Sequence, residues 1–187
     1  PTPFQTNRGE QGKVWEVMMS DTPYELLSSV PFIRAAHGHV LIIGLGIGAT
    51  TLPVLRNKDV GSVTVVEVNK TVIRAVEEPL RWALTKHENA KFRVIHGNGR
   101  TFEPSRQYDT IWIDIWPDIS LDNRADLKRL KMKYVKSLRP SHRSWIGAWE
   151  ESRLDRWHLE KVQRPDPLAA VGGDVSAGFK KVNGIKL

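Results

Sequence analysis

The hydrophobic residues of the chain form short continuous runs, and the segments between these runs have helical spacing. Val40–Ile43 is such a run, as expected for a strand buried on both faces, and further strands are expected at Val63–Val68, Phe92–Ile95, Thr110–Asp114 and Ser144–Trp149. Apolar spacing between the strands predicts helices at Ala49–Asn57, Lys70–Leu84, Asn123–Leu138 and Glu151–Val162. Strands that alternate with helices predict an α/β fold, a Rossmann-like doubly wound, mostly parallel sheet flanked by helices.

The two ends of the chain lack this alternation. Residues 1–20 are interpreted as an N-terminal arm with a short edge strand at Val14–Met19. Residues 21–164 are expected to form the Rossmann-like domain. Residues 165–187 are interpreted as a tail rich in proline and glycine, in which Asn183-Gly184 predicts the turn of a β-hairpin.

The first helix of the main domain has a clear start signal. Asp21 or Thr22 is the expected N-cap, with Pro23 in the first turn and Glu25 just after it. Pro31 is expected to kink or interrupt this helix.

A glycine-rich segment, Gly44-Leu45-Gly46-Ile47-Gly48, directly follows the first predicted strand and opens a helix. Glycine lets the backbone turn sharply and approach a ligand closely. Glu67 ends the second predicted strand, where a carboxylate can accept hydrogen bonds from both hydroxyls of an adenosine ribose. Because the carboxyl ends of neighbouring parallel strands lie together, these residues predict a nucleoside cofactor site.

The identity of the cofactor depends on residues farther along the chain. Gly44, Gly46 and Ala49 also satisfy the dinucleotide pattern G-x-G-x-x-A, so NAD is one alternative. Asn98 follows the third predicted strand, where its side chain is expected to contact the edge of an adenine. Asp114 ends the fourth strand, and together these two residues favour S-adenosylmethionine (SAM).

Four segments carry a family resemblance: Val40–Gly48, Val65–Val68, Gly97–Gly99 and Tyr108–Asp114. Together they resemble class I SAM-dependent methyltransferases, and within that class the spermidine-synthase-like branch. The resemblance covers about Gly38–Glu150. The resemblance implies that Gly44, Gly46 and Gly48 line the methionine and ribose side of SAM. It further implies that Glu67 binds the ribose and that Asn98 lies near adenine. Asp114 would lie at the boundary between cofactor and substrate. The expected cofactor site also includes Leu45, Val68, Gly99 and Trp116.

The chain departs from the polyamine synthases at two places. Their Asp-Ser-Ser-Asp-Pro-like segment is Asp114-Ile115-Trp116-Pro117-Asp118 here, and their usual Gly-Asp-Gly is Gly97-Asn98-Gly99. The first expected function is therefore transfer of a methyl group from SAM to an unidentified acceptor. The alternatives are a spermidine-synthase-like aminopropyltransferase, an NAD-type oxidoreductase and a non-catalytic SAM-binding module, since one fold hosts many activities.

Methyl transfer is an in-line displacement in which positioning supplies much of the acceleration. A carboxylate near the acceptor can take up its proton. Asp114 is the first candidate for this catalytic role and Asp118 the second, with an N-cap or a cofactor-orienting group as the alternative for Asp114. Trp116 is interpreted either as an aromatic wall over the adenine or the acceptor, or as a core residue.

The formal net charge of +7 favours anionic partners by long-range attraction. Much of it lies in Leu127–Lys136, a predicted amphipathic helix. This helix is expected to turn four residues largely toward solvent: Lys128, Arg129, Lys131 and Lys136. This segment suggests a small-molecule or anionic acceptor, with nucleic acid as a less favoured partner, because charged helix faces usually serve solubility. The sequence leaves an oligomer open.

Several classes of site are not expected. The chain has no cysteine, which excludes disulfides, thiolate metal sites and a cysteine nucleophile, and its six histidines show no ligand spacing, so no metal is expected. No apolar run approaches the roughly 20 residues of a membrane helix, and no signal-peptide core is evident. A cytoplasmic location without membrane association is expected.

Overall fold

The computed structural model describes residues 22–118 and 120–163. The expected strand at Val14–Met19, the N-cap candidate Asp21 and the predicted hairpin in the tail lie outside these residues. The chain divides into two compact units, residues 1–151 and 152–187, and the fold described below is that of the first unit.

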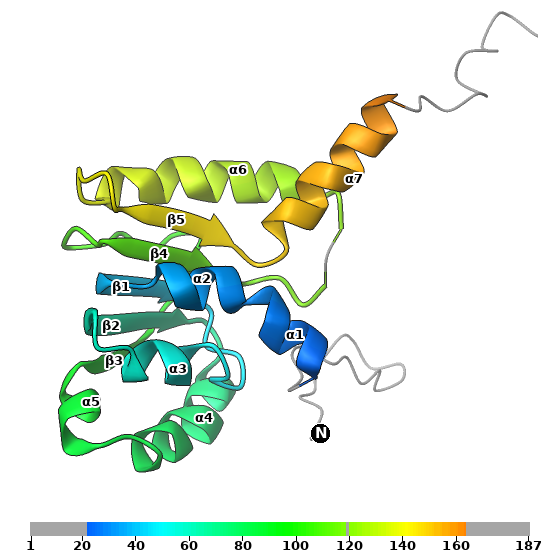
Figure 1. Ribbon diagram of the computed structural model, residues 1–187. Coiled ribbons are helices and arrows are strands. Elements are labelled where there is room, and N and C mark those ends of the chain that lie inside the picture. Colours follow the sequence, from blue (N-terminus) through cyan, green and yellow to red (C-terminus); the bar gives the residue numbers. More distant parts are fainter. Residues whose placement is uncertain (1–21, 119, 164–187) are drawn as a thin grey trace, which may run out of the picture. The chain divides into compact units, whose positions relative to one another are not determined.

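A single five-stranded parallel sheet forms the centre of this unit (Figure 1). Its strands are β1 (Gly38–Ile43), β2 (Val60–Glu67), β3 (Phe92–His96), β4 (Thr110–Ile113) and β5 (Trp145–Ala148). Their order is β3-β2-β1-β4-β5, so the chain first builds outward on one side of β1 and then on the other. The Rossmann-like, doubly wound fold predicted from the sequence is therefore confirmed. The point where the order reverses, between β1 and β4, is where such sheets bind ligands.

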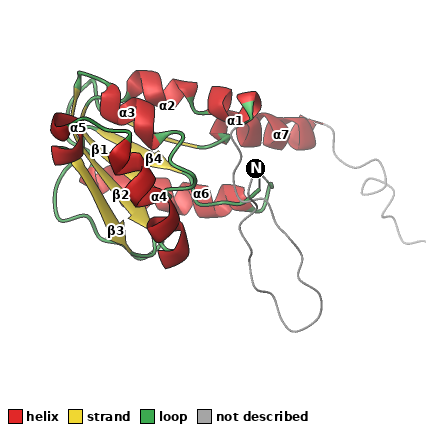
Figure 2. Ribbon diagram, turned by 90° about the horizontal axis from the view of Figure 1, so that it is seen from below, coloured by secondary structure: helices red, strands yellow, loops and turns green. Residues whose placement is uncertain are grey.

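Helices cover both faces of this sheet, with α2 and α3 on one side and α6 on the other (Figure 2). The helices of the unit are α1 (Pro23–Ser28), α2 (Val30–Ala35), α3 (Thr51–Arg56), α4 (Lys70–Trp82), α5 (Lys86–Ala90) and α6 (Asn123–Tyr134), which continues into a 3-10 turn at Val135–Ser137. One more helix, α7 (Glu151–Gln163), belongs almost entirely to the second unit.

The first predicted helix is two short helices. Thr22 is the N-cap of α1, and its hydroxyl accepts from the Glu25 N–H. The interruption falls at Ser29 rather than at Pro31, because Pro31 sits in the first turn of α2, where a missing N–H costs nothing.

The helix expected at Lys70–Leu84 ends at Trp82 and is followed by α5, which the sequence reading missed. Thr85 and Glu88 form a capping box in which each side chain accepts from the other residue's backbone N–H. This local signal was present in the sequence as the pattern T-x-x-E.

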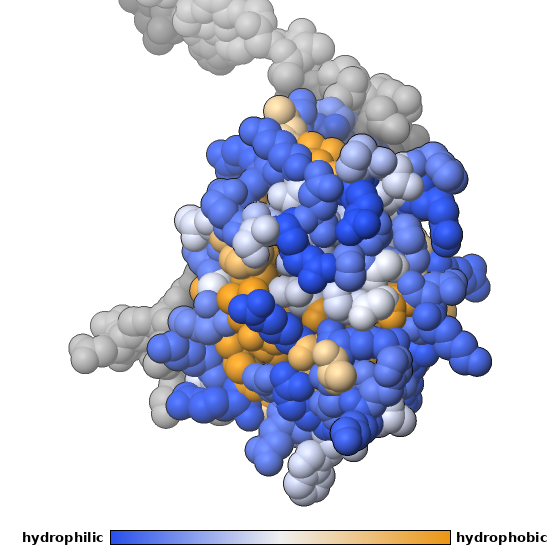
Figure 3. Space-filling model, turned by 90° about the vertical axis from the view of Figure 1, so that its left-hand side faces the viewer, coloured by the Kyte–Doolittle hydropathy of each residue, from blue (hydrophilic) through white to orange (hydrophobic). Residues whose placement is uncertain are grey.

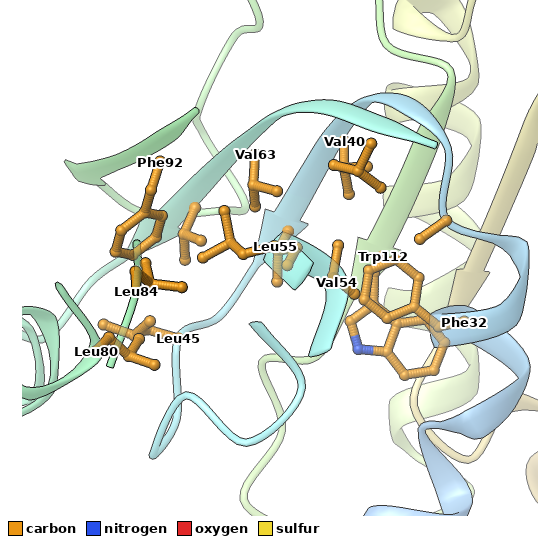
Figure 4. Close-up of a cluster of buried hydrophobic side chains, with 14 of the residues drawn as sticks. Phe32, Val40, Leu45, Val54, Leu55, Val63, Leu80, Leu84, Phe92 and Trp112 are labelled. Atoms are coloured by element: carbon orange, nitrogen blue, oxygen red, sulfur yellow. The ribbon is translucent and has the colours of Figure 1, made fainter. Parts of the chain in front are cut away.

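The hydrophobic core on the α2 and α3 side of the sheet is built on the alternate residues of the strands (Figure 4). Val40, Val63 and Trp112 point into it and are 3% exposed or less. On the other face, α6 buries Leu127, Leu130 and Tyr134, as its apolar spacing predicts.

The candidate cofactor ligands gather at one end of the sheet. Where the strands begin, hydrophilic side chains surround a smaller hydrophobic area (Figure 3). The residues singled out as candidate cofactor ligands lie at the opposite end, where the strands finish. No helix within residues 22–118 and 120–163 combines the length and the hydropathy of a membrane span.

Candidate functional site

The glycine-rich loop is held tightly between β2 and β4. The Gly44 N–H donates to the Val66 carbonyl at 2.8 Å, and Gly44 has a φ of 104°. A Cβ on this residue would lie 1.8 Å from the carbonyl oxygen of Asp114. Only glycine fits, since the close approach and the left-handed backbone each exclude a side chain. The loop and the end of β4 therefore form one packed unit.

Glu67 connects this loop to β2. Its carboxylate is buried, with one oxygen accepting from the Leu45 N–H and the other from the Asn69 N–H, each at 2.8 Å. The acid therefore orders the loop from which a cofactor would be held. A carboxylate offers about four lone-pair positions, so these two bonds leave acceptor capacity for a ribose hydroxyl.

Val68, the next residue, is 61% exposed although it is apolar. Its carbonyl oxygen lies 3.1 Å from the His96 imidazole Nε2 at the end of β3. The buried acid and the exposed valine are thus adjacent at the carboxyl end of β2, where a flat apolar ligand surface would cover the valine.

The loop after β3 is anchored to α6. The Tyr134 hydroxyl donates to the Gly99 carbonyl at 2.6 Å, and burial raises the pKa of this tyrosine, so it stays a donor. Asn98 is exposed, and its side-chain oxygen accepts from the Arg100 N–H at 2.9 Å. This bond uses the Asn98 carbonyl within the turn and leaves its NH₂ group for an external acceptor.

Asp114 stands directly after β4, where its N–H donates to the Ile43 carbonyl at 2.7 Å. Burial, together with the weaker effect of the negative charges of Glu25 and Glu67, raises the pKa of its carboxyl group to about 7. The nearby Trp112 indole acts in the opposite direction. A carboxyl group with such a pKa exchanges protons at neutral pH, which suits a general base.

Asp118, the second catalytic candidate, is exposed, and its main-chain carbonyl accepts from the Asn123 amide at 3.0 Å. Among the described residues its side chain has no hydrogen bond or ion pair that would bring it to Asp114. Asp118 remains a prediction without support from the geometry.

Trp116 is only 8% exposed, and its indole N–H donates to Asp126 of α6 at 3.3 Å. The same carboxylate oxygen accepts from Nε and Nη2 of Arg100, at 3.1 and 2.8 Å. Asp126 thereby connects the loops after β3 and β4. The position of Trp116 favours the core interpretation over that of an open aromatic wall.

Three residues at this end of the sheet were missed in the sequence reading: Glu25, Trp112 and Asp126. The sequence did contain a feature that could have identified Trp112. It precedes Asp114 by two residues, and the alternation of side chains along a strand places both on one face. Glu25 and Asp126 had none, since only the tertiary fold brings their helices to the loops.

The basic segment of α6 is partly neutralised. Lys131 forms an ion pair with Glu151, and Lys133 forms one with Glu103 at 3.1 Å. The expectation that Lys131 lies largely toward solvent was therefore wrong, because it reaches the residue that opens α7. Lys128 and Arg129 are exposed as expected.

Within the described ranges, no three His, Asp or Glu side chains are grouped so that they could hold a metal ion.

The segment that contains these residues also matches a known protein family. Residues 21–138 match the family described as the spermine/spermidine synthase domain. A polyamine aminopropyltransferase from Shigella boydii serotype 4 is 32% identical over 95 residues, which cover 49% of this chain and 33% of the relative. The chain thus matches about a third of the length of this curated relative.

Solved structures with a similar fold include methyltransferases. The structure of a Staphylococcus aureus protein described as a caffeoyl-CoA O-methyltransferase matches with a TM-score of 0.53 and 20% sequence identity. The match covers 81% of this chain and 68% of that one. The glycopeptide N-methyltransferase MtfA, in complex with S-adenosyl-L-homocysteine, has a TM-score of 0.51 and 21% identity, covering 62% and 45%. At these identities the likeness shows the fold, a class I methyltransferase type of Rossmann-like domain.

Proposed function

The chain belongs to the spermine/spermidine synthase family, and from this premise we propose that it binds an adenosyl sulfonium compound and transfers an alkyl group from it to an acceptor. The first candidate donor is SAM and the first candidate reaction is methyl transfer. The observation that carries the proposal is the packing of Asp114 against the glycine loop that Glu67 orders.

The residues present fit such a donor. The Gly44–Gly48 backbone allows close approach, Glu67 keeps acceptor capacity for the ribose, and Val68 offers an exposed apolar contact for adenine. The Asn98 NH₂ group is a donor for a ring nitrogen of the base. MtfA holds S-adenosyl-L-homocysteine in a domain of this fold, which supports the same use here.

When bound, the sulfonium donor supplies an electrophilic carbon. The role of the protein is then to hold the acceptor in line with that carbon and to take up a proton. We assign the proton to the Asp114 carboxylate, whose pKa of about 7 leaves it ionised in a large fraction of molecules at neutral pH. The new bond forms between carbon and the acceptor atom, the carbon–sulfur bond breaks, and its electron pair stays on sulfur.

Aminopropyl transfer is the second candidate, and both the family match and the charges near Asp114 favour it. Within residues 22–118 and 120–163, the charged side chains that act on the Asp114 charge are the carboxylates Glu25 and Glu67, with no cation among them. A donor without a carboxylate, such as decarboxylated SAM, avoids repulsion there, and a polyamine acceptor would be attracted. Methyl transfer is nevertheless the first candidate reaction, because the segment Asp114–Asp118 departs from the synthase pattern.

The leaving product distinguishes the two reactions. The protein is incubated with SAM or with decarboxylated SAM, together with a set of small amines and a metabolite extract. Methyl transfer releases S-adenosylhomocysteine from SAM, and aminopropyl transfer releases methylthioadenosine from the decarboxylated donor. Both products are quantified by mass spectrometry, with Asp114→Asn as the control. Binding of both donors without either product would assign a non-catalytic module, and binding of NAD alone would remove the proposal.

A further inference from the structure

Trp112, in the middle of β4, carries a buried polar group with no partner. The residue is 3% exposed, and its indole Nε1 has no hydrogen bond to any described residue. An unsatisfied buried N–H is destabilising, so a native fold rarely contains one without a reason.

The Trp112 ring cannot turn its N–H elsewhere. It stacks on Phe32 with ring centroids 4.9 Å apart and an interplanar angle of 2°, and on Trp145 at 6.1 Å and 16°. Figure 4 shows the Trp112 ring lying against Phe32 within the core cluster. Stacked rings in a close-packed core keep their orientation. The direction of the N–H is therefore fixed by the fold.

The Asp114 carboxyl lies near enough to this donor to feel its effect. Trp112 and Asp114 are two residues apart and so lie on the same face of the sheet. The indole is close enough to favour the charged form of the carboxyl, although its geometry is not that of a formed hydrogen bond. Among the described residues, the charged groups that act on Asp114 are Glu25 of α1 and Glu67 of β2, and both favour its neutral form.

We propose that Trp112 is a positioning residue for Asp114, and that its indole N–H binds one carboxylate oxygen when Asp114 ionises. The bond would turn that oxygen toward the core and leave the other oxygen to face the acceptor. This inference rests on the proposed function for its role in transfer, whereas the hydrogen bond itself does not depend on donor or acceptor.

A donor of this kind also balances the acidic surroundings. Glu25 and Glu67 make the ionised Asp114 unfavourable, and an aligned N–H stabilises only the ionised form. Trp112 thereby sets how readily Asp114 becomes the base, while Phe32 and Trp145 hold the ring in place.

The test is a titration of the Asp114 carboxyl in protein labelled with carbon-13 aspartate, without donor or acceptor, with the signal assigned by Asp114→Asn. Trp112→Phe keeps a ring in the stack and removes the N–H, so the pKa of Asp114 should rise by about one unit. Trp145→Phe makes the same change in the same stack and should leave that pKa within about 0.3 units of the wild type. Equal pKa values in the wild type and Trp112→Phe would overturn the proposal.

A second measurement needs only the wild type and Asp114→Asn, in case Trp112→Phe fails to fold. The proton signal of the Trp112 indole N–H should move downfield as pH rises through about 7, following Asp114. In Asp114→Asn this movement should disappear. An indole signal that does not change with pH in the wild type would also overturn the proposal. Either result is independent of transfer activity, so failure of this inference and failure of the proposed function are separate outcomes.

Discussion

Replacement of Glu67 by glutamine tests how the glycine loop is held. The glutamate accepts two backbone N–H bonds, from Leu45 and Asn69, each at 2.8 Å and in a buried position. Glutamine has the same shape but only one acceptor oxygen, so one N–H would face the NH₂ group. Loss of one hydrogen bond to a charged acceptor costs about 1.5–3 kcal/mol. The free energy of unfolding should fall by about that amount.

The affinity of the Glu67→Gln variant for the donor should also decrease, because the loop and the ribose use the same carboxylate. A loss of about 1.5–3 kcal/mol corresponds to roughly a 10- to 150-fold weaker affinity for S-adenosylhomocysteine. Urea unfolding measures the first quantity and calorimetric titration the second.

A matched control is available on α4. Glu77 forms an ion pair with Arg81 at 2.7 Å in a partly exposed position, so Glu77→Gln should change the free energy of unfolding by no more than about 1 kcal/mol and leave donor binding intact. If Glu67→Gln behaves like Glu77→Gln in both assays, Glu67 neither orders the loop nor binds the donor.

Three further predictions concern the packing, the chemistry and the charge of the site. Gly44→Ala should lower the free energy of unfolding by about 4 kcal/mol or more, since its Cβ would lie 1.8 Å from the Asp114 carbonyl oxygen. The control Gly61→Ala should not, because the nearest atom to its Cβ lies at 3.6 Å. Equal urea unfolding midpoints for the two variants would contradict this. The transfer rate should rise with pH through about 7, because Asp114 must lose its proton to act as a base, and a flat pH–rate profile from pH 5 to 9 (roughly) would assign the proton elsewhere. Affinity for short RNA and DNA is measured at about 50 and 200 mM salt in two double charge-reversal variants, one on α6 and a control away from α6. The two variants should bind equally, because the charges of α6 are expected to serve solubility. A loss of affinity in the α6 variant alone would identify α6 as a nucleic-acid surface. The two double variants are Lys128→Glu with Arg129→Glu, and Lys86→Glu with Arg93→Glu.

The sequence was informative wherever a local pattern has one structural solution. The run Val40–Ile43 followed by Gly44 predicted a buried strand and a tight loop, and β1 and the loop lie there because no polar group interrupts the strand. Glu67 was identified from its place at a strand end. Its two bonds to backbone N–H groups were not, because they depend on how the loop folds back over β2.

The contacts that cross the fold could not be read from the chain. Glu25 acts on Asp114 although 89 residues separate them, and Asp126 joins Arg100 to Trp116 across two loops. Such pairs arise only once β4 is placed beside β1 and α6 is packed on the sheet. The same packing explains why Trp116, expected at the ligand, is largely buried.

The most direct test of the account is a crystal structure of the chain grown with S-adenosylhomocysteine. We predict that the ligand lies at the carboxyl ends of β1 and β2, with its ribose hydroxyls within hydrogen-bonding distance of Glu67 and its adenine against Val68. Its sulfur would lie on the side of Asp114. Ligand bound elsewhere on the fold, or a ribose with no contact to Glu67, would contradict the assignment of this loop as the donor site.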